Sequence, residues 1–90
     1  MAKTSKTLER YYKGVANHHR IQILRLISEK GSMTLFDLSE TTKANIKTTS
    51  EHTIRLVKAG LLTKEYRGKY VYHVLTPYGQ IMLDTFDLFN

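Results

Sequence analysis

Hydrophobic residues recur with helical spacing over the first third of the chain. They stand at positions 8, 11, 12, 15 and 16, and they form a wide stripe over residues 21–27. These spacings predict two helices, the first over residues 5–16. Asn17 is a typical cap for the start of the second helix, and Gly31 is a typical stop at its end.

Two further helices are expected on either side of a short turn. Thr34 and Asp37 have the spacing of a capping box, in which a hydroxyl and a carboxylate three residues later open a helix. That third helix is short, and a turn over residues 42–44 follows it. Asn45 then caps a fourth helix over residues 46–58.

The fourth helix is expected to bury one face and to expose the other. A spacing of three or four residues places on the inner face Ile46, Thr49, Thr53, Leu56 and Val57. The opposite face presents Lys47, Thr48, Glu51, Arg55 and Lys58. Two short helices joined by such a turn have the form of a helix-turn-helix.

The period of the hydrophobic pattern changes after Gly60. Residues 61–67 and 70–75 read as two β-strands, with Gly68 and Lys69 in the tight turn between them. Thr76 and Pro77 then favour the start of a last helix over residues 77–89. One side of that helix would carry Tyr78, Ile81, Met82, Thr85, Phe86 and Phe89, with Leu83 and Leu88 off to one side.

The element order is therefore helix, helix, helix, helix, hairpin, helix. It predicts a mainly α domain with a small β-hairpin, that is, an α+β fold of the winged helix-turn-helix type. The helix-turn-helix would span about 35–58 and the wing about 61–75. With 90 residues, the chain has room for one small domain over residues 1–90.

The basic residues are concentrated in one part of the chain. The formal net charge is +6, and residues 43–73 hold seven of the 14 basic side chains but only two of the eight acidic ones. Clustered positive charge is the pattern expected of a protein that binds nucleic acid. A solvated basic face and attraction to an anionic membrane are the alternatives.

Several classes of location are disfavoured by what the sequence lacks. No hydrophobic run approaches the roughly 18 residues of a membrane span, so no membrane partner is expected. The first fifteen residues carry four basic side chains with no hydrophobic stretch behind them, which argues against a secretory signal. The absence of cysteine agrees with a cytoplasmic chain without disulfides.

Neither catalysis nor a metal site is expected. Ser50 and His52 stand two apart on a helix and do not face one another, and no phosphate-binding loop or paired carboxylates are present. His18 and His19 are adjacent on a helix and point about 100° apart, so they are not a ligand pair. The chain is therefore not expected to be an enzyme or to hold a cofactor or metal.

Three stretches carry a family resemblance when taken together. Residues 16–26, 37–62 and 65–76 follow one register and resemble the ArsR family of winged-helix transcriptional repressors. Thr42 and Thr53 stand where that family usually has leucine, and His73 stands where an aromatic residue is usual. These departures predict that the packing between helices at the two threonines is looser or rearranged.

Many ArsR-like proteins bind metals, and the resemblance allows those positions to be checked here. The metal ligands are cysteines at the start of the third helix, or sets of Asp, His and Glu on the last helix. In this chain the positions that correspond to those cysteines are Thr34 and Phe36, and the last helix offers Asp84 and Asp87 without a histidine. The resemblance therefore brings no metal site with it.

The DNA-binding residues are expected on the fourth helix and the wing. In helix-turn-helix proteins the second helix lies in the major groove with its N-terminal residues nearest the bases. Lys47 is suited to donate hydrogen bonds to O6 and N7 of guanine, and Thr48 is suited to contact a thymine methyl group or a phosphate. Glu51 either accepts from cytosine or pairs with Arg55 on the helix surface. The full predicted set is Lys43, Asn45, Lys47, Thr48, Ser50, Glu51, His52, Arg55, Arg67 and Lys69.

Some members of this set have two interpretations. Ser50 and His52 are expected within reach of phosphate, and by resemblance they belong to the DNA-facing helix, but His52 is also suited to packing between helices. Arg67 and Lys69 flank the turn of the wing, where they would straddle phosphates or enter a minor groove. Arg20 either touches phosphate or forms a structural salt bridge.

The two terminal helices, 5–16 and 77–89, carry more hydrophobic residues than a small domain needs. In the resembled family the terminal helices form a two-fold dimer interface, which suits binding to palindromic DNA. The residues expected there are Leu8, Tyr11, Tyr12, Val15, Tyr78, Ile81, Met82, Phe86 and Phe89. The alternative is that both helices only complete the core of one protomer.

The leading functional hypothesis is a homodimeric, sequence-preferring transcriptional regulator, a repressor by resemblance, with double-stranded DNA and a second copy of itself as partners. A winged-helix protein-interaction module is one alternative, but it has no need for basic residues on both the helix and the wing. A non-specific, chromatin-like DNA-binding protein is the other. The sequence does not identify a small-molecule effector.

Overall fold

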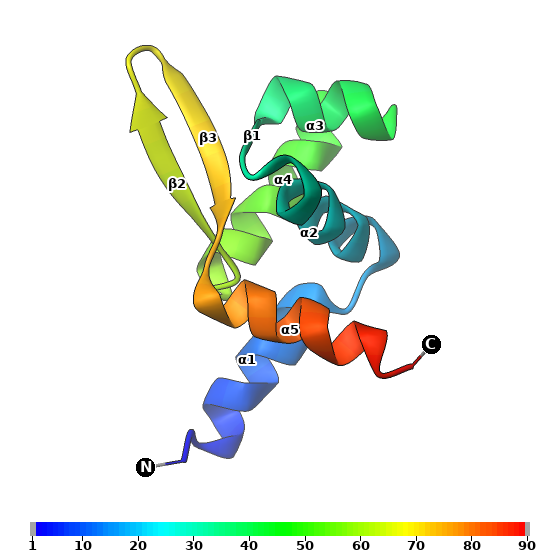
Figure 1. The fold of residues 1–90 in the computed structure, drawn as a ribbon, viewed down its shortest axis with the longest axis vertical. Coiled ribbons are helices and arrows are strands. Elements are labelled where there is room, and N and C mark those ends of the chain that lie inside the picture. The colour runs from blue at the N-terminus through cyan, green and yellow to red at the C-terminus, as the bar shows by residue number, and fades with distance from the viewer. Residues whose placement is uncertain (1, 90) are drawn as a thin grey trace.

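Five helices and three strands make up the part of the chain that the computed structural model describes, residues 2–89. In chain order they are α1 (Ser5–Val15), α2 (His18–Lys30), β1 (Met33–Thr34), α3 (Leu35–Thr42), α4 (Ile46–Lys58), β2 (Leu62–Arg67), β3 (Tyr70–Leu75) and α5 (Pro77–Asp87). Figure 1 shows α2 crossing in front of α4, with α1 and α5 below them and the β2–β3 hairpin standing to one side. The predicted order of the five helices and the hairpin is confirmed, and so is the mainly helical α+β class.

The caps expected from the sequence are formed. The side chain of Asn17 accepts hydrogen bonds from the backbone N–H groups of His19 and Arg20, and Gly31 ends α2 at a φ of 88°. Thr34 and Asp37 make both hydrogen bonds of the capping box. Thr76 accepts from the N–H of Gly79 at the start of α5. Each of these side chains satisfies N–H groups that the first turn of a helix leaves without a partner.

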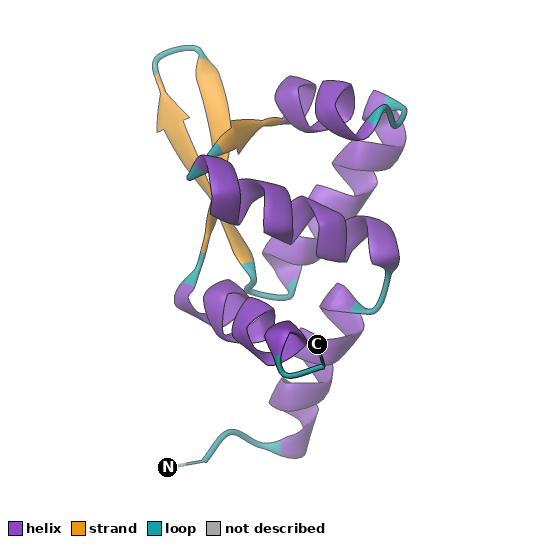
Figure 2. Ribbon diagram, turned by 45° about the vertical axis from the view of Figure 1, so that its right-hand side comes forward, coloured by secondary structure: helices purple, strands orange, loops and turns teal. Residues whose placement is uncertain are grey.

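The sheet contains a strand that the sequence did not predict. β1 pairs antiparallel with β3, Met33 lying opposite His73, and β3 pairs with β2 in the hairpin, so the strand order is β1-β3-β2. β1 is two residues long and has no hydrophobic period of its own. Figure 2 shows that the far end of the hairpin extends past the helices, and its turn is an exposed loop.

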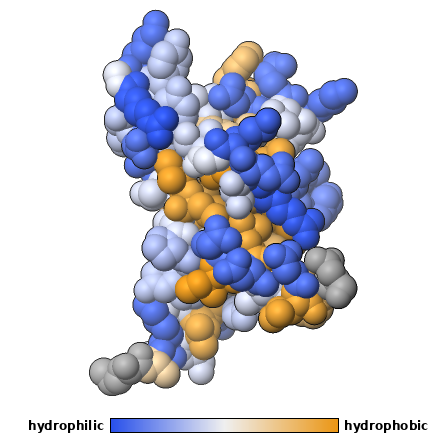
Figure 3. Space-filling view, in the orientation of Figure 1, coloured by the Kyte–Doolittle hydropathy of each residue, from blue (hydrophilic) through white to orange (hydrophobic). Residues whose placement is uncertain are grey.

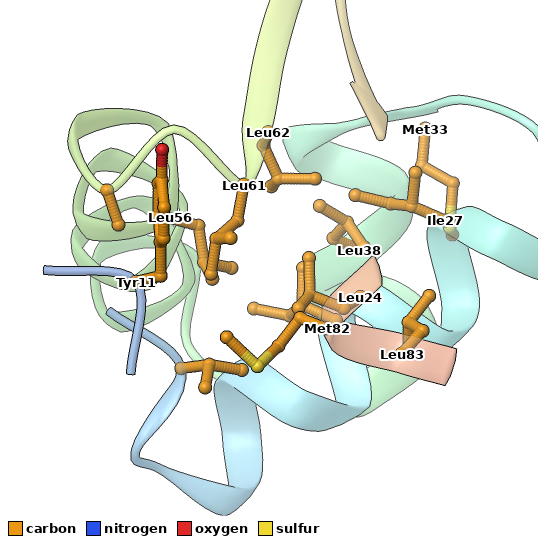
Figure 4. Packing of buried hydrophobic residues seen from close by; sticks show 13 residues of the cluster. Tyr11, Leu24, Ile27, Met33, Leu38, Leu56, Leu61, Leu62, Met82 and Leu83 are labelled. Carbon is orange, nitrogen blue, oxygen red and sulfur yellow. The ribbon is translucent and has the colours of Figure 1, made fainter. Parts of the chain in front are cut away.

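The core lies where α2, α4, α5 and the base of the hairpin meet. Figure 4 shows Leu24, Leu56, Leu61 and Met82 pointing toward one another from these elements. Leu83 is also buried in this cluster, which corrects its predicted place off to one side of the last helix. Burial of this apolar surface is the main favourable term in the folding of a domain of this size.

Two other expectations need correction. The last helix ends at Asp87 and not at residue 89, so Leu88 and Phe89 lie in the turn beyond it and are exposed. Ile46, expected on the inner face of the fourth helix, is the first residue of α4 and is 49% exposed. None of the helices within residues 2–89 is long and hydrophobic enough to cross a bilayer.

Candidate nucleic-acid interface

The N-terminal end of α4 is capped by Asn45 and exposed to solvent. The side-chain oxygen of Asn45 accepts from the backbone N–H of Lys47 at 2.7 Å and of Thr48 at 3.4 Å. Asn45 therefore has a structural task in addition to any contact with DNA. Lys47, Thr48 and Glu51 follow on the exposed side of the first two turns. We call the exposed residues Lys47, Thr48, Glu51, Arg55 and Lys58 the outer face of α4.

The inner face of α4 is buried although it carries hydroxyl groups. Thr49 and Thr53 are almost fully buried together with Leu56. The hydroxyl of Thr49 donates to the carbonyl of Asn45 at 2.9 Å, and that of Thr53 donates to the carbonyl of Ser50 at 2.9 Å. Each threonine thus satisfies its polar atom within α4, as a buried hydroxyl must. Ser50 itself is half-buried beside them.

The turn between α3 and α4 is fixed by local hydrogen bonds. Lys43 ends α3 in the left-handed conformation, with a φ of 56°, and its N–H donates to the carbonyl of Ser39. The hydroxyl of Ser39 donates to the carbonyl of Ala44 at 2.7 Å, and that of Thr42 donates to the carbonyl of Leu38 at 2.7 Å. These contacts set the angle between the two helices and leave the side chain of Lys43 exposed.

Two exposed hydrophobic residues on α4 were missed as candidate contacts. Ile46 stands beside Lys47 at the start of the helix, and Ile54 is 42% exposed. Ile54 lies three residues after Glu51 and four before Lys58, so helical spacing alone would have placed it on the outer face. Branched apolar side chains at such positions are suited to contact with thymine methyl groups in a major groove.

Arg20 links α2 to both α1 and α4. Its guanidinium donates to the carbonyl of Lys13 at 3.3 Å, to the carbonyl of Gly14 at 3.0 Å and to Nδ1 of His52 at 3.2 Å. Arg20 is therefore structural, but through hydrogen bonds and not through the salt bridge considered from the sequence. Its charge has no carboxylate partner within residues 2–89.

His52 is packed between helices, the second of its two interpretations. Its ring stacks on that of His19 with centroids 5.5 Å apart, and it is half-buried. Burial lowers the pKa of His52, and the positive charge of Arg20 lowers it further. The neutral ring accepts the Arg20 hydrogen bond at Nδ1, so its proton is on the other nitrogen.

Glu51 and Arg55 do not form the ion pair that their spacing allows. The salt bridges among the described residues are Glu9–Lys13 at 3.1 Å and Glu65–Arg67 at 2.7 Å. Both members of the 51/55 pair are exposed on the outer face of α4. Their charges are consequently available to a partner.

The wing carries its two cations on either side of Gly68, as predicted, but each contacts a neighbouring side chain. Arg67 donates to Oε1 of Glu65 at 2.7 Å and lies over the ring of Tyr72 at 4.4 Å, while Lys69 lies over the ring of Tyr70 at 5.5 Å. The hydrogen bond from Arg67 lowers the pKa of Glu65. An exposed pair of this kind contributes little stability, so Arg67 can exchange Glu65 for a phosphate at small cost.

The residues expected at a dimer interface divide into two groups. Tyr11, Val15 and Met82 are buried in the protomer core, and Phe86 is half-buried against it, which corrects their prediction as dimer-interface residues. The exposed members are Leu8, Tyr12, Tyr78, Ile81 and Phe89. Figure 3 shows hydrophobic side chains at the surface along α5.

A cavity lies between α1 and α5, lined by residues of both groups. We call Leu8, Tyr12, Tyr78 and Ile81 the apolar patch; these side chains line a cavity of about 210 Å³ between α1 and α5. The rings of Tyr11 and Tyr78, which both line this cavity, stack with centroids 5.1 Å apart and so connect α1 with α5.

The described residues contain no group of three or more His, Asp and Glu side chains placed to hold a metal ion. The rings of His18 and His19 lie against each other with centroids 4.0 Å apart. The histidines on α2 and α4 thus form a stacked cluster with Arg20.

Comparison with known proteins shows which family the chain resembles in sequence and which solved structures share its fold. The profile of the family described as "Bacterial regulatory protein, arsR family" matches residues 17–64, which run from the cap of α2 into the wing. A search of curated proteins gives no match.

Solved structures agree with the profile. One is a possible transcriptional regulator for arsenical resistance, 29% identical, covering 88% of this chain and 82% of its own, with a TM-score of 0.72. The homodimeric winged helix-turn-helix DNA-binding domain of Mb0332 from Mycobacterium bovis is 22% identical, covers 94% and 90%, and has a TM-score of 0.77. The transcriptional repressor PagR of Bacillus anthracis is 15% identical, covers 90% and 93%, and has a TM-score of 0.82. At these low identities, the similarity to Mb0332 and to PagR shows that this chain shares their fold.

Proposed function

The chain belongs to the arsR family of bacterial regulatory proteins, and we propose that it acts as a homodimeric transcriptional repressor that prefers particular sequences of double-stranded DNA. Its fold is that of winged-helix transcriptional regulators, which are not enzymes. In this proposal α4 enters the major groove and the turn of the wing lies on the backbone or in the adjacent minor groove.

One observation carries the proposal. The exposed residues at the start of α4 (Lys47, Thr48 and Glu51) are free of internal partners, while the opposite face of the same helix is buried. A helix that presents a donor, a hydroxyl and a carboxylate at its N-terminal end has the groups that distinguish bases in the major groove. The cations of the wing supply sequence-independent attraction to phosphates.

The homodimer is proposed from the apolar patch. Four large exposed side chains on two neighbouring helices form a surface that a second copy would cover by a two-fold axis. The Mycobacterium bovis relative is itself described as homodimeric, which supports the same arrangement here. Two α4 helices related in this way would read half-sites roughly 34–36 Å apart, one turn of the duplex. The repressor role is proposed from the family resemblance and from PagR.

Selection from random duplex DNA at two salt concentrations tests this proposal. We expect enrichment of a sequence with two-fold symmetry, with weaker total binding at higher salt. Binding without enrichment would point to a non-specific DNA-binding protein, and no binding at either salt concentration would point to a protein-interaction module.

Single substitutions sharpen the test. Lys47→Ala is expected to change the recovered sequence, because a good side-chain contact to a base supplies about 1–3 kcal/mol of discrimination. Arg67→Ala, the matched removal of a cation from the wing, is expected to weaken binding to all sequences alike. Equal losses on selected and scrambled duplexes for both variants would contradict a reading role for α4.

A further inference from the structure

A second basic surface lies between α1 and the C-terminal end of α4. It is a groove of about 470 Å³ lined by six cationic side chains and one carboxylate, that of Glu9. The cations are Lys6, Arg10 and Lys13 on α1, Arg20 on α2, and Arg55 and Lys58 on α4. We call this the basic groove. Only Arg55 belongs both to it and to the DNA-binding set predicted from the sequence.

The charge of the basic groove is not balanced within the described residues. Glu9 pairs with Lys13 at 3.1 Å, and none of the other five cations forms an ion pair in residues 2–89. Burial and repulsion from Arg55 both lower the pKa of Arg20, which shows how closely the cations are gathered. A groove with this surplus of positive charge attracts anions.

Local stability explains only part of this arrangement. Arg55 and Lys58 stand in the last turn of α4, where cations interact favourably with the helix dipole. Lys6 stands in the first turn of α1, where the dipole disfavours a cation, and that turn has no acidic residue to offset it. The position of Lys6 is therefore unfavourable for the stability of α1, so helix stability does not explain why a lysine stands there.

The basic groove continues the outer face of α4. Lys47, Glu51, Arg55 and Lys58 follow one another at spacings of four, four and three residues, so they share one side of the helix. Lys47 and Lys58 are about 16 Å apart along the axis at 1.5 Å per residue. When α4 enters a major groove by its N-terminal residues, its last turn and α1 lie farther from the bases, beside the phosphates that border the groove.

The cations of α1 remain accessible when its hydrophobic side is covered. Lys6, Arg10 and Lys13 are exposed and recur at helical spacing on one face, whereas Leu8 and Tyr12 are exposed on the opposite face. Close contact between Gly14 and Ala59 holds the basic face against the end of α4. A protomer can thus use the apolar patch and the basic groove together.

We propose that the basic groove binds backbone phosphates of the DNA beyond the stretch read by α4, so that α1 is itself a DNA-contacting element. This proposal rests on the proposed function, and it extends the DNA surface along most of the molecule. The exposure of five of the six cations suits an extended polyanion, whereas small-molecule sites enclose most of their ligand.

A pair of matched double variants tests the proposal in the full chain. Lys6→Gln with Arg10→Gln removes two cations from the basic groove. Arg25→Gln with Lys30→Gln removes the same two residue types from exposed positions on α2, away from the groove. Arg10 and Arg25 each lie over an aromatic ring, at 5.2 and 5.9 Å, so the control also matches that contact. Circular dichroism spectra of both variants are recorded first, to check that they are folded.

Binding to a mixed-sequence duplex of about 40 base pairs, roughly four turns, is then measured over a salt series. We expect the groove variant to lower the slope of log affinity against log salt by about 0.9 for each phosphate that it no longer neutralises. If each protomer of the dimer neutralises two fewer phosphates, the decrease in affinity is about a hundredfold larger at 50 mM than at 200 mM salt. The control variant is expected to keep the slope of the unmodified chain.

Three results would overturn the proposal, and they are distinguishable. Equal slopes for the groove and control variants, with DNA bound by the unmodified chain, would remove the groove from the DNA surface and leave the proposed function standing. Absence of DNA binding by the unmodified chain would overturn both this proposal and the proposed function. Thermal stabilisation of the unmodified chain by inorganic tripolyphosphate, absent in the groove variant while DNA binding is unchanged, would make the groove a site for a small phosphorylated ligand.

Discussion

Asn45 joins the fold to the proposed function at a single residue. Its side chain caps α4 by accepting two backbone N–H groups, and it stands beside the residues proposed to read DNA. Because Asp caps helices as well as Asn does, substitution can separate the two roles. A negative charge at the start of a helix also interacts favourably with the helix dipole.

We expect Asn45→Ala to lower the free energy of unfolding by about 1 kcal/mol, the usual effect of losing a cap. Asn45→Asp should unfold at the same urea concentration as the unmodified chain or higher. The Asp variant should nevertheless bind DNA more weakly, because its carboxylate faces phosphates. Undiminished DNA binding by the Asp variant would place Asn45 outside the interface.

His73 is the most deeply buried histidine of the described residues, and its titration can be measured through stability. It lies on β3, with Nδ1 3.4 Å from the carbonyl oxygen of Met33 and with Lys64 opposite it in the sheet. Burial is the main cause that lowers its pKa, and the Met33 carbonyl acts in the opposite direction. The folded state therefore favours the neutral ring.

The sign of the pH dependence follows from this. The unfolded chain takes up a proton at the ordinary histidine pKa of about 6.5, before the folded chain does. The contribution of His73 to stability is thus complete above about pH 6.5 and is lost as the pH falls toward the lower folded pKa. The slope is at most about 1.4 kcal/mol per pH unit for one proton.

Urea unfolding at pH values between about 7.5 and 5.5 measures this effect. We expect His73→Phe to have a smaller loss of stability on acidification than the unmodified chain, with His52 accounting for part of the remainder. His18→Gln, changed at an exposed position, is the control. An unaltered dependence in the Phe variant would show that His73 takes no part.

At the scale of elements, the approach of α1 to α4 depends on one small residue on each. Gly14 of α1 lies so close to Ala59, at the end of α4, that a Cβ added to Gly14 would collide with that of Ala59. Side chains in a packed interior have little room to yield. This contact also fixes the wall of the basic groove, since both residues line it.

Gly14→Ala is expected to cost about 1–3 kcal/mol of stability, the usual effect of overpacking. Combining it with Ala59→Gly should restore a large part of that stability, because the second change removes the atom in the way. Urea unfolding of the two single variants and the double variant gives the coupling energy. A double variant whose destabilisation equals the sum of the two single effects would contradict close packing at this point.

Most elements were predictable because their signals are local. The caps at Asn17, Thr34, Asn45 and Thr76 each depend on one side chain and the helix that follows it, and all four are formed. β1 was not predictable in this way, since two residues become a strand only by pairing with β3, some forty positions later. The end of α5 was misplaced because hydrophobic residues continue past the last helical turn.

The candidate site was predicted in its elements more than in its details. Spacing alone identified the exposed basic residues of α4 and the two cations of the wing. It did not show that Arg67 is held by Glu65 or that Arg20 bridges three helices, because these contacts join residues through the tertiary fold. It also assigned Tyr11, Val15 and Met82 to a partner, since the same hydrophobic spacing serves a core and an interface equally well.

At the scale of the whole molecule, the proposed homodimer depends on the apolar patch. A domain of this size buries a modest share of its surface, and a second copy would cover side chains such as Ile81, which is 57% exposed. Placing a charge there would leave that charge buried in a dimer without a partner. The same charge on the surface of a monomer would have little effect.

We expect the unmodified chain to elute from gel filtration at about twice its protomer mass of 10.4 kDa, at micromolar concentration. Ile81→Glu should shift it to the protomer mass. Phe36→Glu, at an exposed hydrophobic position on α3 outside the patch, should elute as the unmodified chain does. Elution of the unmodified chain as a single protomer would discard the dimer.

The central claim is that α4 and the wing form one surface for duplex DNA. Backbone amide resonances, recorded while a duplex from the selection is added, test it most directly. The account predicts the largest shifts at the start of α4, around Lys47, and at the wing turn around Gly68, with smaller ones along α1. Shifts confined to α5, or to α3 and β1, with α4 and the wing unchanged, would contradict it.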